Sequence, residues 1–296
     1  MSGLASRPTA ATSAAKIARS ALSCAFVALG LSGCDDGDSP LSSGTELLVV
    51  TGYLFAGEPV GEVDVSVTVP LDSESEVAPA VNDARLVLTV NETSYELELA
   101  LGDSGRYAYP AGDLTVMPGD ALSLRVERGD MVVRAATVVP PAPVNLTVSA
   151  ERLVVEPDTA FAGFGGFGRF ARQGEDAGET LTVSWEAEED ARYFVTIENV
   201  EADPDSVESL IARPPGSFAS PLMRGNSLAI QSLFIGFYGT HEVRVFRVTE
   251  EYAALEAFRF QNLDELAEPP TNIENGLGIF TAFSSAVVEF EVVRPD

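Results

Sequence analysis

Apolar and polar residues alternate one by one over several short stretches of this sequence. The clearest stretch is residues 63–69, in which four valines are separated by polar residues. Successive side chains of a strand point to opposite faces, so this pattern predicts a strand with all its valines on one buried face. A chain with many such stretches is expected to be mainly β.

The first half of the chain repeats this pattern between turns rich in glycine and proline. The strands expected there cover residues 46–54, 63–69, 86–90, 95–99, 106–109, 122–126 and 131–139. Seven short strands spaced about 8 to 12 residues apart, with no helical period, are typical of an antiparallel, immunoglobulin-like β-sandwich. We therefore predict an N-terminal β-sandwich over residues 45–139.

Residues 140–143, Pro-Pro-Ala-Pro, are expected to end this domain, because three of the four lack an amide donor and cannot continue a central strand. Beyond this linker, residues 144–296 form a second predicted β-rich domain. Its expected strands cover residues 144–155, 181–185, 193–197, 227–235, 242–248 and 286–293. Trp185, at the end of one strand, is expected in the core. The fold class predicted is two consecutive antiparallel β-sandwich domains.

One short helix is predicted near the C-terminus. Thr249 has the character of an N-cap, and the two glutamates that follow suit the positive end of a helix dipole. Apolar residues recur at helical spacing after it. The expected buried stripe is Tyr252, Leu255 and Phe258, continued by Phe260 and Leu263.

Residues 1–33 have the features of a cleaved secretory signal. Arg7, Lys16 and Arg19 precede the uncharged, small or apolar residues 21–31. That run is shorter than the roughly 20 residues of a membrane-spanning helix. It ends in Leu-Ser-Gly-Cys, which resembles the lipobox of bacterial lipoproteins and implies that Cys34 carries the lipid. The alternative is an incidental cysteine after an ordinary signal cleavage.

Residues 34–44 are expected to be an acidic, flexible tether, since they are rich in aspartate, glycine and serine. After cleavage the chain keeps 15 arginines, no lysine and 45 acidic residues, a net charge near 15 − 45, or −30. This argues against nucleic acid as a partner and against docking on anionic lipid. Cys34 becomes the only thiol, so no internal disulfide is expected. The acidic surface indicates either a solvated face or adaptation to high salt.

The most unusual segment is residues 161–170, where glycines separate four phenylalanines. These are Phe161, Phe164, Phe167 and Phe170. The segment also contains a formal Gly-x-Gly-x-x-Gly, but no credible helix follows, so a dinucleotide site is not predicted. Large apolar rings avoid water unless they are covered. They are expected to fold back over their own sandwich, to insert into a protein partner or lipid, or to stay disordered.

No catalytic, cofactor-binding or metal site is predicted. His241 is the only histidine, and it is expected to be a turn or strand-edge residue rather than a zinc ligand or triad member. Calcium is a weaker alternative at three acidic places without an EF-hand pattern. These are Asp72/Glu74/Glu76, residues 186–190 and Asp203/Asp205.

Three segments resemble uncharacterised, domain-of-unknown-function bacterial lipoproteins of the kind encoded beside TonB-dependent outer-membrane receptors. They are Gly52-Tyr53 with the valine alternation that follows, Gly105-Arg106-Tyr107 with residues 118–124, and residues 271–280. The resemblance implies an N-terminal immunoglobulin-like or carboxypeptidase-regulatory-like sandwich and no known activity. Residues 271–280 are expected to be a turn that fixes the last strand's register or, alternatively, a recognition loop.

The function expected from these observations is non-catalytic. The chain is predicted to be a cell-envelope protein, held at the membrane through the lipid on Cys34, that acts as a binding or accessory module of an outer-membrane receptor or envelope complex. An outer-membrane location is favoured, with the leaflet left open. The alternatives are a structural or adhesive surface protein and, third, a carbohydrate-active hydrolase, since carboxylates are plentiful.

Overall fold

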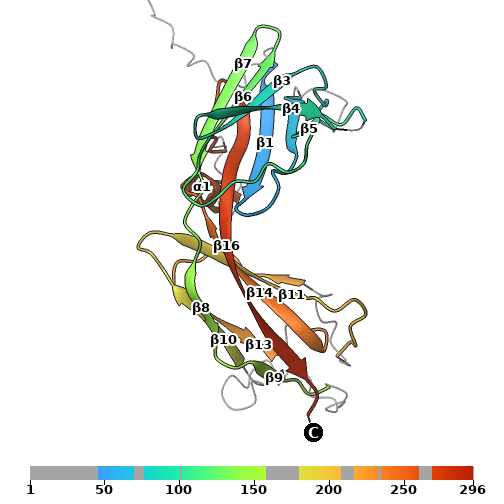
Figure 1. The fold of residues 1–296 in the computed structure, drawn as a ribbon, viewed down its shortest axis with the longest axis vertical. Helices are drawn as coiled ribbons and strands as arrows, with labels where there is room; N and C mark the ends of the chain where they lie inside the picture. Colours follow the sequence, from blue (N-terminus) through green and yellow to red (C-terminus); the bar gives the residue numbers. More distant parts are fainter. Residues whose placement is uncertain are drawn as a thin grey trace, which may run out of the picture. The chain divides into compact units, whose positions relative to one another are not determined.

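The computed structural model describes residues 46–69, 77–100, 102–157, 180–207, 217–232, 235–259 and 269–295 (Figure 1). It is mainly β with one helix, and its large, mostly antiparallel sheets confirm the predicted sandwich class. Among the described residues, no helix has both the length and the apolar character needed to cross a bilayer.

The first hydrophobic core is enclosed chiefly by strands from the N-terminal half. They are β1 (Leu48–Phe55), β2 (Val63–Val67), β3 (Arg85–Val90), β4 (Thr93–Leu99), β5 (Arg106–Ala108), β6 (Ala121–Arg128) and β7 (Met131–Val138). Neighbouring strands among these pair antiparallel in the order β1-β2-β5-β4-β3-β6-β7. The predicted alternation is confirmed in β2, where Val63, Val65 and Val67 are at most 5% exposed. Val69 lies beyond the end of β2.

The second core is built mainly by later strands. They are β8 (Val144–Val148), β9 (Arg152–Val154), β10 (Thr180–Glu186), β11 (Arg192–Asn199), β12 (Ser217–Ala219), β13 (Ser227–Gln231) and β14 (Gly239–Val248). β13, β10 and β8 form a separate three-stranded sheet, whereas β12, β11 and β14 extend the large sheet. Trp185 is 3% exposed within this core and contacts Tyr193, as predicted for a core tryptophan.

The last strand serves both cores. β15 (Ile273–Glu274) pairs with β7, and the long β16 (Leu277–Val293) pairs first in parallel with β1 and then antiparallel with β14 (Figure 1). Phe280 therefore lies in the first core and Phe290 in the second. The division expected at residues 140–143 does not include the return of β16 to the first core. This C-terminal strand completes the N-terminal sandwich.

β16 also begins earlier than the sequence predicts. We expected a turn over residues 271–280 and a strand only from residue 286, because two glycines interrupt the apolar pattern. Instead, Gly278 lies inside the strand and pairs with Val50 of β1. Glycine is required there by close approach of the two backbones rather than by a turn. An alanine Cβ at Gly278 would lie 2.0 Å from the Val50 carbonyl oxygen.

The predicted helix is confirmed as α1 (Glu250–Arg259). The Tyr252 amide donates to the Thr249 hydroxyl at 3.4 Å, which is the expected N-cap geometry. The predicted buried stripe is wrong, because no residue of α1 is fully buried. Tyr252, Leu255 and Phe258 are only half-buried, since the helix packs against the sheet on one side and meets solvent on the other. Phe260 and Leu263 lie outside the described residues.

Candidate functional site

Six aromatic side chains gather on one face of the large sheet, where β1, β16, β14 and β11 lie side by side next to α1 (Figure 1). We call them the aromatic cluster: Tyr53, Phe55, Phe194, Phe246, Tyr252 and Phe283. Phe283 is central, because its ring centroid lies 4.9 to 6.3 Å from those of Tyr252, Phe55, Tyr53 and Phe194. It is 3% exposed, whereas the other five are half-buried or exposed.

Strand register produces this cluster. Phe194 on β11 lies opposite Phe246 on β14, and Phe55 on β1 lies opposite Phe283 on β16. Opposed side chains of neighbouring strands are within contact distance, so each pair stacks across the strands. The Phe194 and Phe246 centroids are 4.6 Å apart with an interplanar angle of 11°, and those of Phe55 and Phe283 are 5.1 Å apart at 18°. The cluster thus joins strands from both halves of the chain.

Charged side chains at the rim of the cluster are paired. The Arg244 guanidinium lies 5.9 Å from the Phe246 ring centroid and donates to Glu242 at 2.9 Å and to Glu58 at 3.3 Å. Near Tyr53 and Tyr252, Arg259 donates to Glu256 at 2.8 Å. These pairs neutralise the rim, and the aromatic rings are left as its main contact surface.

The two tyrosines of the cluster remain protonated at neutral pH. Burial raises the pKa of the Tyr53 and Tyr252 hydroxyls above the ordinary value of 10.0, and the nearby Glu256 carboxylate adds to both rises. A protonated phenol can donate as well as accept a hydrogen bond. The cluster therefore offers apolar rings with two polar donors at one side.

His241 is a buried residue of an interior strand rather than the turn or strand-edge residue expected. It is 2% exposed on β14 and stacks on Phe290, with ring centroids 5.3 Å apart. Its Nδ1 donates to the Gly239 carbonyl at 3.0 Å, which leaves Nε2 as an acceptor facing the Asn199 amide at 3.5 Å. These contacts occupy both ring nitrogens.

We predict that His241→Gln will weaken the pH dependence of stability near pH 6. Burial lowers the pKa of His241 below its ordinary 6.5, so the unfolded chain takes up a proton more readily than the folded chain does. This contribution is fully present above about pH 6.5 and is lost as pH falls toward the folded pKa, with a slope of at most about 1.4 kcal/mol per pH unit. Urea unfolding at pH 7.5 and pH 5.5 measures it. Equal losses in wild type and variant would contradict the assignment.

The acidic places considered for calcium are held by protein groups where the structure describes them. Within residues 186–190, the Asn145 amide donates to Glu186 at 2.8 Å and Arg247 binds Glu188. Asp205 pairs with Arg294 at 3.3 Å. In the described part of the chain, no three His, Cys, Asp or Glu side chains come together as metal ligands would. Asp72, Glu74 and Glu76 lie outside the described residues.

The segment 271–280 is tied down by its own polar side chains. The Asn272 amide pairs with the Phe280 backbone in both directions, donating to its carbonyl at 2.7 Å and accepting from its amide at 3.0 Å. Thr271 donates to the Gly278 carbonyl at 2.8 Å and accepts from the Ile273 amide at 3.0 Å. These contacts are what is expected of a segment that fixes the register of the last strand. They favour that role over a recognition loop.

The other sites predicted from sequence cannot be placed. Cys34 and the four phenylalanines Phe161, Phe164, Phe167 and Phe170 lie outside the described residues, as do the three glycines of the dinucleotide-like pattern. The aromatic cluster was not predicted. Its signal in the sequence is that Phe55, Phe194 and Phe246 occupy positions of the strand alternation where polar residues are expected on a solvent-facing side.

Two solved structures are similar to the chain at low identity. One, described as "Cytokine receptor complex - Crystal form 2", shares 14% identity over 68% of this chain and 89% of that chain, with a TM-score of 0.24. The other contains domains A168–A170 of titin and shares 10% identity over 84% of this chain and 66% of that chain, with a TM-score of 0.20. No curated protein matches the chain.

A family model matches most of the chain. It is described as a domain of unknown function, DUF4249, and it spans residues 36–288, which include every strand from β1 to β15 and most of β16. The match covers the first hydrophobic core, the second core apart from Phe290 and Val292, and the aromatic cluster. The chain therefore belongs to the DUF4249 family of uncharacterised domains.

Proposed function

We propose that this protein is a lipid-anchored component of the bacterial cell envelope that binds a protein partner and performs no catalysis. Its place would be that of an accessory module of an outer-membrane receptor or envelope complex. The lipobox at Cys34 supports the anchor, and the resemblance to lipoproteins encoded beside TonB-dependent receptors supports the kind of partner. The single observation that carries the binding role is the aromatic cluster.

The cluster favours a protein surface over a sugar as its ligand. Phe194 and Phe246 come from adjacent strands, which lie about 4.8 Å apart, and their rings are nearly parallel with centroids 4.6 Å apart. Rings stacked across strands in this way stand upright on the sheet and turn their edges outward. A sugar ring packs on the flat face of an aromatic ring, whereas aromatic side chains of a protein also pack edge-to-face against rings. This geometry disfavours the carbohydrate-active alternative.

We predict that a photoreactive benzoyl-phenylalanine at position 246 will crosslink in intact cells to a single envelope protein. Phe246 is half-buried and contacts Phe55 and Phe194, so an aromatic replacement keeps its packing. The matched control is position 138, because Val138 is a 56% exposed apolar residue that belongs neither to the cluster nor to a core. Mass spectrometry of the crosslinked product identifies the partner.

A second change makes the crosslinking result specific. Phe194→Ser removes the ring stacked on position 246 and is expected to abolish the product, while the protein still folds because Phe194 is not part of either buried core. The same product from position 138, or its persistence in the Phe194→Ser background, would reject the cluster as the binding surface. Loss of cell attachment without any crosslink would favour the structural or adhesive alternative.

A further inference from the structure

Two arginines face each other across neighbouring strands on the outer side of the first sandwich. Arg125 on β6 and Arg134 on β7 are directly opposed in the antiparallel register. Opposed residues have Cβ atoms about 4.5 to 5.5 Å apart, and like charges there repel each other. Both guanidinium groups are accessible, since the Arg125 side chain is 41% exposed and Arg134 is exposed. This chain has 45 acidic and 18 basic residues, so the juxtaposition needs an explanation.

Neighbouring carboxylates pair with Arg125 but not with Arg134. Glu127 accepts from Arg125 at 2.8 Å, and Arg85, which faces Glu127 at 3.6 Å, donates to Glu96 at 2.8 Å. Among the described residues, Arg134 makes no hydrogen bond or ion pair. Glu274 on β15 lies opposite Arg134 in the strand register, yet the Glu274 carboxylate forms no ion pair with Arg134. Arg134 is thus a guanidinium with free donors beside a second positive charge.

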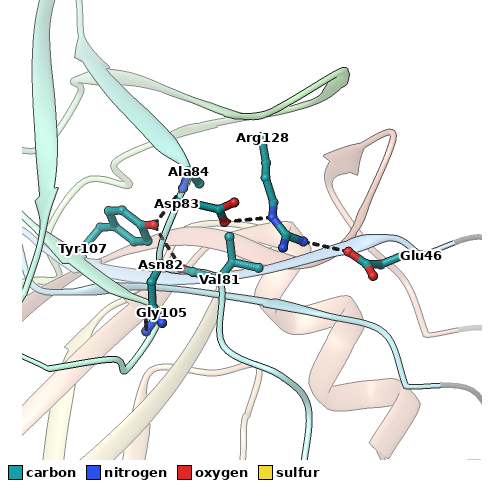
Figure 2. A network of polar contacts seen from close by, with 8 residues as sticks. All are labelled: Glu46, Val81, Asn82, Asp83, Ala84, Gly105, Tyr107 and Arg128. Carbon is teal, nitrogen blue, oxygen red and sulfur yellow. Dashed lines mark hydrogen bonds and ion pairs between the residues drawn. The ribbon is translucent and has the colours of Figure 1, made fainter.

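Arg134 also lines a surface hollow of about 360 Å³ at the start of β1. The apolar part of the hollow is made by Leu47, Met131 and Val132, and the Asn275 amide lies at its edge with Arg134. Two acids contribute as well, Glu46 and Asp130. Glu46 is paired with Arg128, which donates to it at 2.6 Å and to Asp83 at 2.9 Å (Figure 2). An apolar wall therefore adjoins a free guanidinium.

We propose that this hollow binds a small carboxylate that carries an apolar chain, with the carboxylate on Arg134 and the chain against Leu47, Met131 and Val132. Guanidinium groups bind carboxylates through two parallel hydrogen bonds, and a carboxylate at Arg134 would occupy its free donors. A single negative charge fits better than a phosphate dianion, because Asp130, Glu127 and Glu274 make the surroundings acidic. This site is separate from the aromatic cluster and does not depend on the proposed partner.

Titration with octanoate tests the proposal. The protein is the chain from residue 34 onward with Cys34→Ser, so that no detergent competes, and binding is followed by NMR of backbone amides. Octanoate is expected to shift the amides of residues 131–134 and 275. Arg134→Gln should weaken its affinity at least about tenfold, as expected for loss of a charged hydrogen-bonding pair. The matched control, Arg224→Gln, removes an exposed arginine elsewhere and should leave the affinity unchanged.

Three further ligands decide which part of the proposal holds. Octylammonium has the same chain with the opposite charge and should not bind, and acetate, which lacks the chain, should bind at least about tenfold more weakly than octanoate. Inorganic phosphate should also bind more weakly than octanoate. Unchanged octanoate affinity in Arg134→Gln, or equal binding of octanoate and octylammonium, would overturn the site. Equal affinity for octanoate and acetate would overturn the role of the apolar wall.

Discussion

A Gly278→Ala variant is expected not to accumulate as a folded protein. The added Cβ would lie 2.0 Å from the Val50 carbonyl oxygen and 3.0 Å from the Val50 amide nitrogen, both rigid backbone atoms of β1. Gly278 also has φ = +109°, a conformation that residues with a side chain rarely adopt. Neither problem can be relieved by a rotamer change, so the two strands must separate.

The substitution destabilises the pairing of β1 with β16, which joins an early strand to the last one. Gly278 is paired with Val50 within the parallel ladder between β1 and β16, which runs from Val49↔Leu277 to Phe55↔Phe283. Displacing β16 here also pulls Phe280 out of the first core. Backbone strain alone costs about 1 to 3 kcal/mol, and the lost packing adds to it. The sum is expected to reach a large part of the roughly 5 to 15 kcal/mol by which a protein is stable.

Gly112→Ala is the matched control for this prediction. Gly112 also has positive φ, at +70°, but nothing lies within 4 Å of a Cβ added there. It should therefore show only the conformational penalty, about 1 kcal/mol. The free energy of unfolding in urea, or the yield of folded protein where unfolding cannot be measured, separates the two variants. Equal losses in both would mean that the approach of β1 and β16 is not as close as described.

Gly278 also shows where prediction from the sequence stops. The alternation of apolar and polar residues reveals which segments are strands, and it gave β1 to β7, the helix cap at Thr249 and the buried Trp185 correctly. It carries no information about which strands pair over long distances. The parallel pairing of β1 with β16 joins residues more than 220 positions apart. Without that pairing, Gly278 was taken for a turn residue, whereas Gly276 does lie in the turn between β15 and β16.

The candidate site was beyond prediction for a related reason. Alternation assigns Phe55, Phe194 and Phe246 to one side of their own strands, but only the register between strands brings their rings together. The sequence drew attention instead to Phe161, Phe164, Phe167 and Phe170, whose aromatic spacing is visible without any fold. The opposed Arg125 and Arg134 were likewise invisible, because they are close only through the β6–β7 pairing.

Cys34→Ser is expected to move the protein from the membrane fraction to the soluble fraction almost completely. The described residues contain no helix able to cross a bilayer, and the charge of about −30 left after cleavage opposes adsorption to anionic lipid. Under the proposed function, the lipid on Cys34 is then the whole of the attachment. Two or more acyl chains anchor a protein stably at a membrane, whereas the variant carries no acyl chain and therefore has no lipid anchor.

Cys24→Ser is the matched control for the anchor, because Cys24 lies in the apolar part of the expected signal and leaves with it. It should remain in the membrane fraction, and metabolic labelling with a radioactive fatty acid should mark this variant and not Cys34→Ser. Membrane retention of Cys34→Ser would reject the lipobox and require another attachment.

The structure also limits how far the first sandwich can lie from the membrane. Glu46 lies at the edge of the first sandwich, where Arg128 donates to it at 2.6 Å, so only the residues between Cys34 and Glu46 separate the lipid from the first sandwich. Twelve residue steps span at most about 40 Å when fully extended. Lengthening this tether with glycine and serine should leave membrane attachment intact. It should weaken crosslinking at position 246 if the partner is an integral envelope protein, since a longer tether lowers the effective concentration of the two surfaces.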